Sequence, residues 1–173
     1  YGLELHQHAH GLDDRPVTPT AGDSVKSIGR STTLAHDLTD LEAARAIILA
    51  LTDEVGASAR HQGKKAHTVQ LTLKFNDFRV ITRQSRIRPT CTTKDLYAAA
   101  CRLLVENWQR QRPVRLLGVS ITGFDQPCDL RQLSVFDLAG GTRKEEREEK
   151  LDRTIDAIRD RYGSGYVTYG KLV

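Results

Sequence analysis

The stretch Val25-Lys26-Ser27-Ile28-Gly29-Arg30-Ser31-Thr32-Thr33-Leu34 combines strand-type alternation with small, hydroxylated and basic side chains. In a strand, successive side chains point to opposite faces of the sheet. One face of this strand would then hold only small residues, namely Ser27, Gly29, Ser31 and Thr33. A phosphate oxygen can approach the backbone N–H and hydroxyl groups of such a face, with Lys26 and Arg30 nearby to supply charge. Taken alone, the stretch also fits a solvated edge strand.

The patterns that follow predict alternating helices and strands around this first strand. Apolar residues recur at helical spacing over residues 39–63 and again over residues 93–111. Clean alternation over residues 68–75 predicts a half-buried strand, and residues 78–88 return as its antiparallel partner. Residues 114–124 supply the last strand. The order β-α-β-β-α-β predicts an α+β fold, a four-stranded antiparallel-type mixed sheet with two helices packed on one face.

The other face of this sheet is expected to be open. The last strand repeats the bare pattern of the first, because Gly118, Ser120 and Thr122 alternate with apolar residues. The hairpin is expected to add polar or basic side chains to the same face: Lys74, Thr82, Arg83 and Arg86.

The net charge is concentrated in this segment. Residues 24–124 carry 16 basic and 8 acidic residues, a net charge of +8, whereas residues 1–23 carry −3 and residues 125–173 carry −1. A compact basic unit between acidic or neutral flanks is typical of a protein that binds a polyanion.

The composition indicates a globular chain, since 39% hydrophobic content over 173 residues is enough for one core. No apolar run reaches the roughly 18 residues of a membrane helix, so we expect no membrane partner and a cytoplasmic location. Three cysteines without a C-x-x-C pair argue against a disulfide framework and fit a reducing compartment. The chain contains no methionine, which suggests a piece of a longer polypeptide.

Three groups of residues resemble chemical sites, but each has a simpler interpretation. His6, His8 and His10 alternate, but no nearby carboxylate or cysteine completes a metal shell. Cys91, His61 and His67 could suggest a thiol nucleophile, but no orienting third group is apparent and packing is the simpler role. The run of glutamates over residues 145–149 is interspersed with basic residues and is interpreted as a solvated helix face.

The motifs over residues 26–32 and 115–124, in this order around two helices and a hairpin, resemble the little finger domain of Y-family DNA polymerases, in particular the bacterial DNA polymerase IV class. By this resemblance residues 24–124 are the DNA-binding little finger, residues 1–12 the end of a thumb-domain helix, and residues 13–23 a linker. The resemblance implies that the domain holds duplex primer–template DNA through backbone phosphates, without reading sequence. The implied contacts are Ser27, Gly29, Arg30, Ser31, Thr32, Arg115, Leu116, Gly118 and Ser120. Leu116 and Ser120 stand where many relatives have basic residues, so we expect this strand to bind DNA more weakly than in those relatives.

The resemblance places the chemistry elsewhere. The family uses two metal ions, Mg²⁺, held by acidic residues of a palm domain for nucleotidyl transfer. That domain lies outside the matched region, so this fragment is expected to hold no cofactor and to be inactive alone. The parent would extend primers across damaged templates.

A second motif, Gln132-Leu133-Ser134-Val135-Phe136, resembles the peptide by which bacterial polymerases bind the sliding clamp. It falls in a predicted loop over residues 125–143, where its apolar side chains can fill a cleft of the partner. The alternative is that Leu133 and Phe136 fold back onto the domain. Residues 144–173 are a predicted C-terminal helix and tail, with a narrow apolar stripe (Leu151, Ile155, Ile158, Tyr162) that must dock somewhere.

Two other functions remain open at this point. An open four-stranded sheet also serves RNA-binding modules, although those stack bases on exposed aromatics of the central strands, and the phenylalanines here fall at strand ends or inward. Alternatively, the C-terminal helix makes the chain a protein-interaction module.

Overall fold

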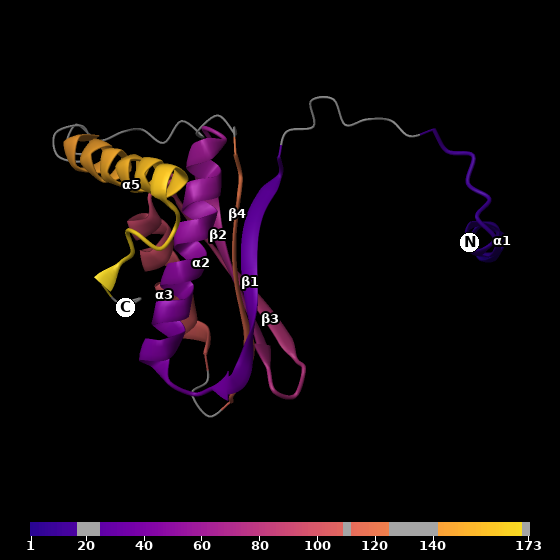
Figure 1. Cartoon of the computed structure of the whole chain (residues 1–173). Helices are drawn as coiled ribbons and strands as arrows, with labels where there is room; N and C mark the ends of the chain where they lie inside the picture. Colours follow the sequence, from indigo (N-terminus) through magenta and orange to yellow (C-terminus); the bar gives the residue numbers. More distant parts are fainter. Residues whose placement is uncertain (17–24, 109–111, 125–141, 171–173) are drawn as a thin grey trace.

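The computed structural model describes residues 1–16, 25–108, 112–124 and 142–170. Four strands form one sheet in the order β1-β4-β2-β3, and every pairing is antiparallel. Their bounds are Ser27–Leu38 (β1), Ala66–Phe75 (β2), Val80–Thr90 (β3) and Val114–Thr122 (β4). Helices α2 (Leu41–His61) and α3 (Thr93–Asn107) cover one face of the sheet and leave the other open (Figure 1). The predicted α+β fold and its element order are confirmed.

The core lies between the sheet and these two helices. Alternate residues of β2 and β4 are almost fully buried, and they pack against aliphatic residues from the inner sides of α2 and α3. Each such side chain contributes about 1.5–3 kcal/mol when removed from water. The largest members are Ile48, Val55, Val69, Leu71, Leu73, Leu96, Leu104, Leu117, Val119 and Ile121.

Several element ends differ from the sequence-based expectation. The helix predicted over residues 39–63 begins at Leu41, and Asp40 caps it by accepting a hydrogen bond from the Ala43 N–H at 2.8 Å. The third strand was predicted over residues 78–88, whereas β3 runs from Val80 to Thr90 and includes Pro89. Because β3 lies at the edge of the sheet, its backbone tolerates a proline that donates no hydrogen bond.

The C-terminal helix α5 (Thr142–Tyr162) docks on the helix layer mainly through an acidic stripe. Within the predicted apolar stripe, Leu151 and Tyr162 are 57% and 55% exposed, and Ile155 and Ile158 are half-buried. The residues that dock recur at helical spacing and pair with basic partners on the domain: Glu148 with Lys94, Glu149 with Lys65, Asp152 and Asp156 with Arg60, and Asp160 with His61. The interpretation of residues 145–149 as a solvated face was therefore wrong for Glu148 and Glu149.

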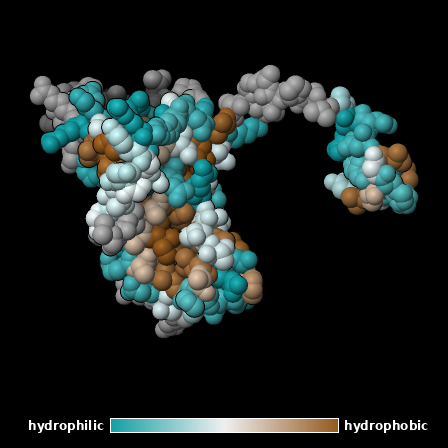
Figure 2. All heavy atoms as spheres, viewed as in Figure 1, coloured by the Kyte–Doolittle hydropathy of each residue, from teal (hydrophilic) through white to brown (hydrophobic). Residues whose placement is uncertain are grey.

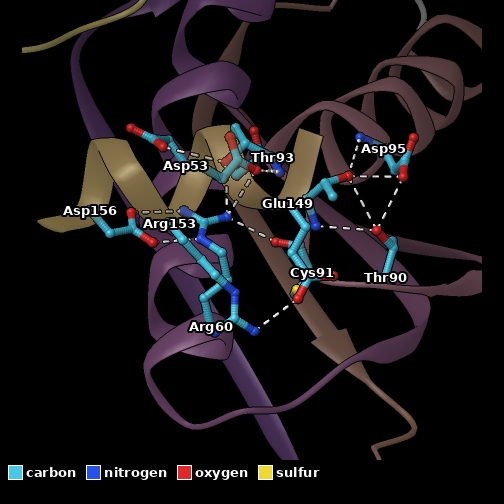
Figure 3. Close-up of polar contacts among 12 residues, drawn as sticks. Asp53, Arg60, Thr90, Cys91, Thr93, Asp95, Glu149, Arg153 and Asp156 are labelled. Atoms are coloured by element: carbon cyan, nitrogen blue, oxygen red, sulfur yellow. Dashed lines mark hydrogen bonds and ion pairs between the residues drawn. The ribbon is translucent and has the colours of Figure 1, made fainter. Parts of the chain in front are cut away.

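Arg60 is the centre of this docking (Figure 3). Its side chain is 2% exposed, and its Nη1 also donates to the Cys91 carbonyl oxygen at 2.8 Å. Asp152 accepts the N–H of Thr93 at 2.8 Å, so a residue of α5 satisfies a free donor at the start of α3. Gly56 leaves room for the guanidinium, because a Cβ there would lie 2.9 Å from Nη1.

The docking position of α5 keeps the open sheet face clear. Figure 1 shows α5 at the upper end of the helix layer, away from that face, and Figure 2 shows it as mainly hydrophilic, with apolar surface gathered over the lower part of α2. Helix α1 (Gly2–Ala9) falls within the predicted helix at residues 1–12 and buries no residue. Among the described residues, no helix is both long enough and apolar enough to cross a membrane.

Candidate nucleic-acid interface

The strand register defines which side chains lie on the open face. Paired residues in an antiparallel sheet point to the same side. Gly29 pairs with Ser120 and Ser31 with Gly118, while Gln70 and Thr72 flank the same β4 residues from the other side. The open face holds Ser27, Gly29, Ser31 and Thr33 of β1, Leu116, Gly118, Ser120 and Thr122 of β4, Thr68, Gln70, Thr72 and Lys74 of β2, and Val80, Thr82, Gln84 and Arg86 of β3. None of these residues is acidic.

The two glycines of this face are required by packing as well as by access. A Cβ on Gly29 would lie 2.8 Å from the Ser120 Cβ, and one on Gly118 would lie 3.1 Å from the Ser31 Cβ. The strands β1 and β4 therefore form a bare surface with a shallow hollow of about 280 Å³. Its lining comes from both strands and from Thr72 of β2, so backbone groups of this area are within reach of a ligand.

Basic residues stand at both ends of the open face. Arg86 lies beside a second hollow of about 540 Å³, together with Thr68, Gln84 and Gly123. Lys74 lies at the opposite end of β2. The intervening surface is uncharged, so a polyanion that follows β2 and β3 meets positive charge at each end.

Three predicted contacts, Arg30, Thr32 and Arg83, have side chains on the other side of the sheet. Thr32 pairs with buried Leu117, so it faces the helix layer. Arg30 lies on the side of α2, with its Nε 3.5 Å from the Glu54 carboxylate. Arg83 was expected on the open face, and this was wrong: it pairs with buried Leu71, and its Nε donates to Asn107 of α3 at 3.0 Å. The irregular alternation of this strand concealed its register. Both arginines lie on edge strands.

Some of the basic residues that give the domain its charge of +8 form ion pairs within the fold. Arg60, Lys65 and Lys94 pair with carboxylates of α5, and Arg60 is buried. Burial alone would lower the pKa of Arg60, but its hydrogen bond to Asp156 and the two nearby carboxylates raise it. These three cations serve docking of α5, and the basic residues facing the open side are fewer than the sequence count suggested.

One feature of this interface was missed by sequence reasoning. Phe78, in the turn between β2 and β3, is 63% exposed, and both Lys74 and Arg115 lie over its ring. An isolated phenylalanine beside Asn76-Asp77 gives no signal of this arrangement in the sequence.

The central strands offer no aromatic side chain to the open face. Phe75 at the end of β2 is 2% exposed and faces the core. An RNA-binding sheet of the base-stacking kind needs aromatic residues there, so the described face does not favour that alternative. The predicted clamp motif, Gln132 to Phe136, lies outside the described residues, as does most of the predicted linker.

Solved structures share this arrangement. A structure described as a complex of beta-clamp processivity factor and little finger domain of PolIV aligns with a TM-score of 0.50 at 28% identity, covering 63% of this chain and 97% of that chain. The crystal structure of DinB from Sulfolobus solfataricus aligns with a TM-score of 0.51 over 70% of this chain and 35% of that chain, and at 18% identity it supports the fold alone. The sheet, its helix layer and its open face thus define a little finger domain of the Y-family type.

The sequence comparisons name the family. Residues 25–135 match the C-terminal domain of the impB/mucB/samB family, and the chain belongs to this family. DNA polymerase IV of Clostridium kluyveri is 42% identical over 175 residues, which cover 99% of this chain and 44% of that protein. DNA polymerase IV of Alkaliphilus oremlandii is 42% identical over 177 residues, covering 100% of this chain and 44% of that protein. The chain thus spans less than half the length of these relatives, and its resemblance to the little finger of the DNA polymerase IV class is confirmed.

Proposed function

We propose that this domain holds duplex DNA against the open sheet face, through backbone phosphates and without sequence specificity. The observation that supports this best is the composition of that face, which combines glycines and hydroxyl side chains with flanking cations and has no acidic residue. Phosphate contacts position a protein on DNA without reading bases. The small residues bring the phosphates close, and the cations at the two ends of β2 and β3 supply the charge.

Individual contacts follow from the geometry and the family resemblance. Ser27, Ser31 and Ser120 offer hydroxyl groups on the open face, and Gly29 and Gly118 expose backbone between them. Arg30 reaches DNA only around the edge of β1, since its side chain starts on the helix side. Lys74 and Arg86 supply positive charge on the open face, and Arg115 lies over the Phe78 ring beside Lys74.

The parent protein would use this domain for DNA synthesis on damaged templates. In that proposal, residues 1–12 end a thumb domain, and Mg²⁺ is held by a palm domain outside this chain. Residues 132–136 dock on the sliding clamp; this is supported by the motif and by the solved little finger of PolIV, which is described in complex with a beta-clamp processivity factor. The protein would act in the cytoplasm of a bacterium.

A salt titration of duplex binding tests the DNA proposal. Binding through phosphates releases counterions, so the affinity for two unrelated duplexes of equal length should fall steeply and equally with salt. Lys74→Ala should reduce the slope of log K against log salt by about 1. The matched control is Lys94→Ala, because Lys94 is also exposed but pairs with Glu148 on the helix layer; it should leave the slope unchanged. Salt-independent binding, or equal effects of both variants, would contradict the proposal.

The clamp proposal needs its own measurement. Phe136→Ala should abolish binding to a bacterial sliding clamp, because the motif loses its largest apolar side chain, and should leave duplex affinity unchanged. Retention of clamp binding by this variant would show that another surface docks.

A further inference from the structure

The turn between β2 and β3 holds a bulky residue in a backbone conformation that favours glycine. Phe78 has a φ of 65°, the positive value that L-residues with large side chains rarely adopt. Its N–H donates to the Phe75 carbonyl oxygen at 3.0 Å, and the Phe75 N–H donates to the Arg79 carbonyl oxygen at 2.9 Å. Hairpins closed in this way usually have glycine at the left-handed position.

The surrounding contacts hold this conformation. Asp77 accepts the Arg79 N–H at 3.2 Å and the Arg112 Nη2 at 2.6 Å. The Asn76 N–H donates to the Pro113 carbonyl oxygen at 3.0 Å. The turn is therefore tied to the segment that leads into β4, and Phe78 is kept in its strained state by neighbours on both sides.

Burial does not explain why a phenylalanine occupies this position. Phe78 is 63% exposed and lies outside the hydrophobic core. Its partners are two cations: Lys74 Nζ lies 4.9 Å from the ring centroid and Arg115 Cζ lies 5.4 Å from it. Strain that persists at an exposed residue is a reason to look for function.

We propose that Phe78, Lys74 and Arg115 form a contact site for one unstacked nucleotide of bound DNA, which rests on the proposed DNA-binding function. The ring stacks on the base, and the two cations bind the phosphates on either side. A charge-assisted bond to phosphate is stronger than an exposed cation–π contact. The cations therefore move from the ring to the phosphates and leave a ring face for the base.

The location of the site indicates which nucleotide it takes. Lys74 belongs to the open face, so the site continues the proposed duplex surface to the end of the β2–β3 hairpin, which is the lower end of the sheet in Figure 1. Bases within a duplex are stacked on each other and offer no free face. An unstacked base occurs in the single-stranded template beyond the primer end, and stacking on an aromatic ring accepts any base.

The test compares Phe78→Gly with the unchanged chain on two DNAs, a blunt duplex and the same duplex with a single-stranded overhang. Glycine suits the positive φ, so the variant should unfold at an equal or higher temperature. Its affinity for the overhang DNA should fall roughly tenfold, as expected for one lost base stack, while its affinity for the blunt duplex stays the same. Phe78→Leu should lose overhang affinity in the same way without gaining stability, and Phe78→Tyr should retain it.

The outcomes separate this inference from the duplex proposal. If the overhang adds nothing to the affinity of the unchanged chain, or Phe78→Gly binds both DNAs normally, the stacking site is wrong. An equal loss on both DNAs would assign Phe78 to the duplex surface and also contradict it. Absence of salt-dependent binding to the blunt duplex by the unchanged chain would contradict the duplex proposal instead.

Discussion

Arg60 of α2 and Asp156 of α5 form a two-point ion pair inside the protein, although 96 residues separate them in the chain. The Arg60 Nε lies 2.6 Å from Asp156 Oδ2, and its Nη2 lies 2.9 Å from Oδ1. Both side chains are almost fully buried. The C-terminal helix therefore joins the little finger as an integral part and does not trail from it as a free tail.

The first prediction concerns the removal of this guanidinium. Arg60→Ala leaves the buried carboxylates of Asp152 and Asp156 without a counter-ion. Removing one partner of a buried ion pair typically lowers the free energy of unfolding by about 3–5 kcal/mol. Urea unfolding should show this loss. The control Lys94→Ala removes an exposed partner of Glu148 and should cost much less than Arg60→Ala, because exposed ion pairs contribute little to stability. A loss for Arg60→Ala as small as that for Lys94→Ala would show that the buried ion pair contributes little to stability.

The thiol of Cys91 reports whether α5 is docked. Cys91 is 2% exposed, and burial is the main reason why its pKa is raised above the usual value for a thiol. A buried, protonated thiol reacts slowly. In a chain with Cys101 and Cys128 replaced by serine, we expect slow labelling by a thiol reagent, and labelling at least about tenfold faster after Arg60→Ala, as expected if roughly 1.4 kcal/mol of protection is lost. Fast labelling of Cys91 in the chain that keeps Arg60 would contradict the docked position of α5.

The sequence predicted the sheet and its two covering helices correctly because their periodic apolar residues are the ones that pack. Val69, Leu71 and Leu73 of β2 alternate in the sequence and are buried in the structure. The bare faces of β1 and β4 were also predicted. They depend on short-range alternation, which the chain shows without ambiguity.

The docking of α5 and the turn at Phe78 depend on contacts between distant segments, and a local pattern does not reveal them. An acidic stripe on a helix normally faces water, so Asp152 and Asp156 gave no sign that Arg60 would bury them. Arg83 was assigned to the wrong face because only its pairing with Leu71 fixes its side. Side-chain partners of this kind require the tertiary structure.

The pair His61 and Asp160 gives α5 docking a dependence on pH. The imidazole Nε2 of His61 donates a hydrogen bond to the Asp160 carboxylate, with 3.1 Å between the two atoms, and this bond raises the pKa of His61. A raised pKa in the folded state stabilises the protein below the unfolded value of about 6.5, and this contribution disappears as pH rises through the folded pKa. Both side chains are more than half exposed, so the effect should stay below about 1 kcal/mol.

An NMR titration of the imidazole measures this directly. Asp160→Asn should lower the pKa of His61 and should remove the difference in stability between pH 5.5 and pH 8.5 that this pair causes. An unchanged pKa of His61 in that variant would assign the shift to another group.

The close approach of Gly29 and Ser120 leads to a prediction about both stability and binding. In Gly29→Ala the new Cβ would lie 2.8 Å from the Ser120 Cβ, so β1 and β4 must move apart. Overpacking of this kind costs about 1–3 kcal/mol, and the displaced strands should bind duplex DNA more weakly. Gly165→Ala is the control, since nothing lies within 4 Å of a Cβ at that position.

A double variant separates the two effects. Adding Ser120→Gly to Gly29→Ala removes the atom that the new Cβ would meet, so most of the lost stability should return, with a coupling energy of at least about 0.5 kcal/mol in a double-mutant cycle. Duplex affinity should recover less than stability, because the double variant also lacks the Ser120 hydroxyl on the open face. Full recovery of affinity would show that this hydroxyl does not contact DNA, and purely additive stabilities would show that the two residues do not touch.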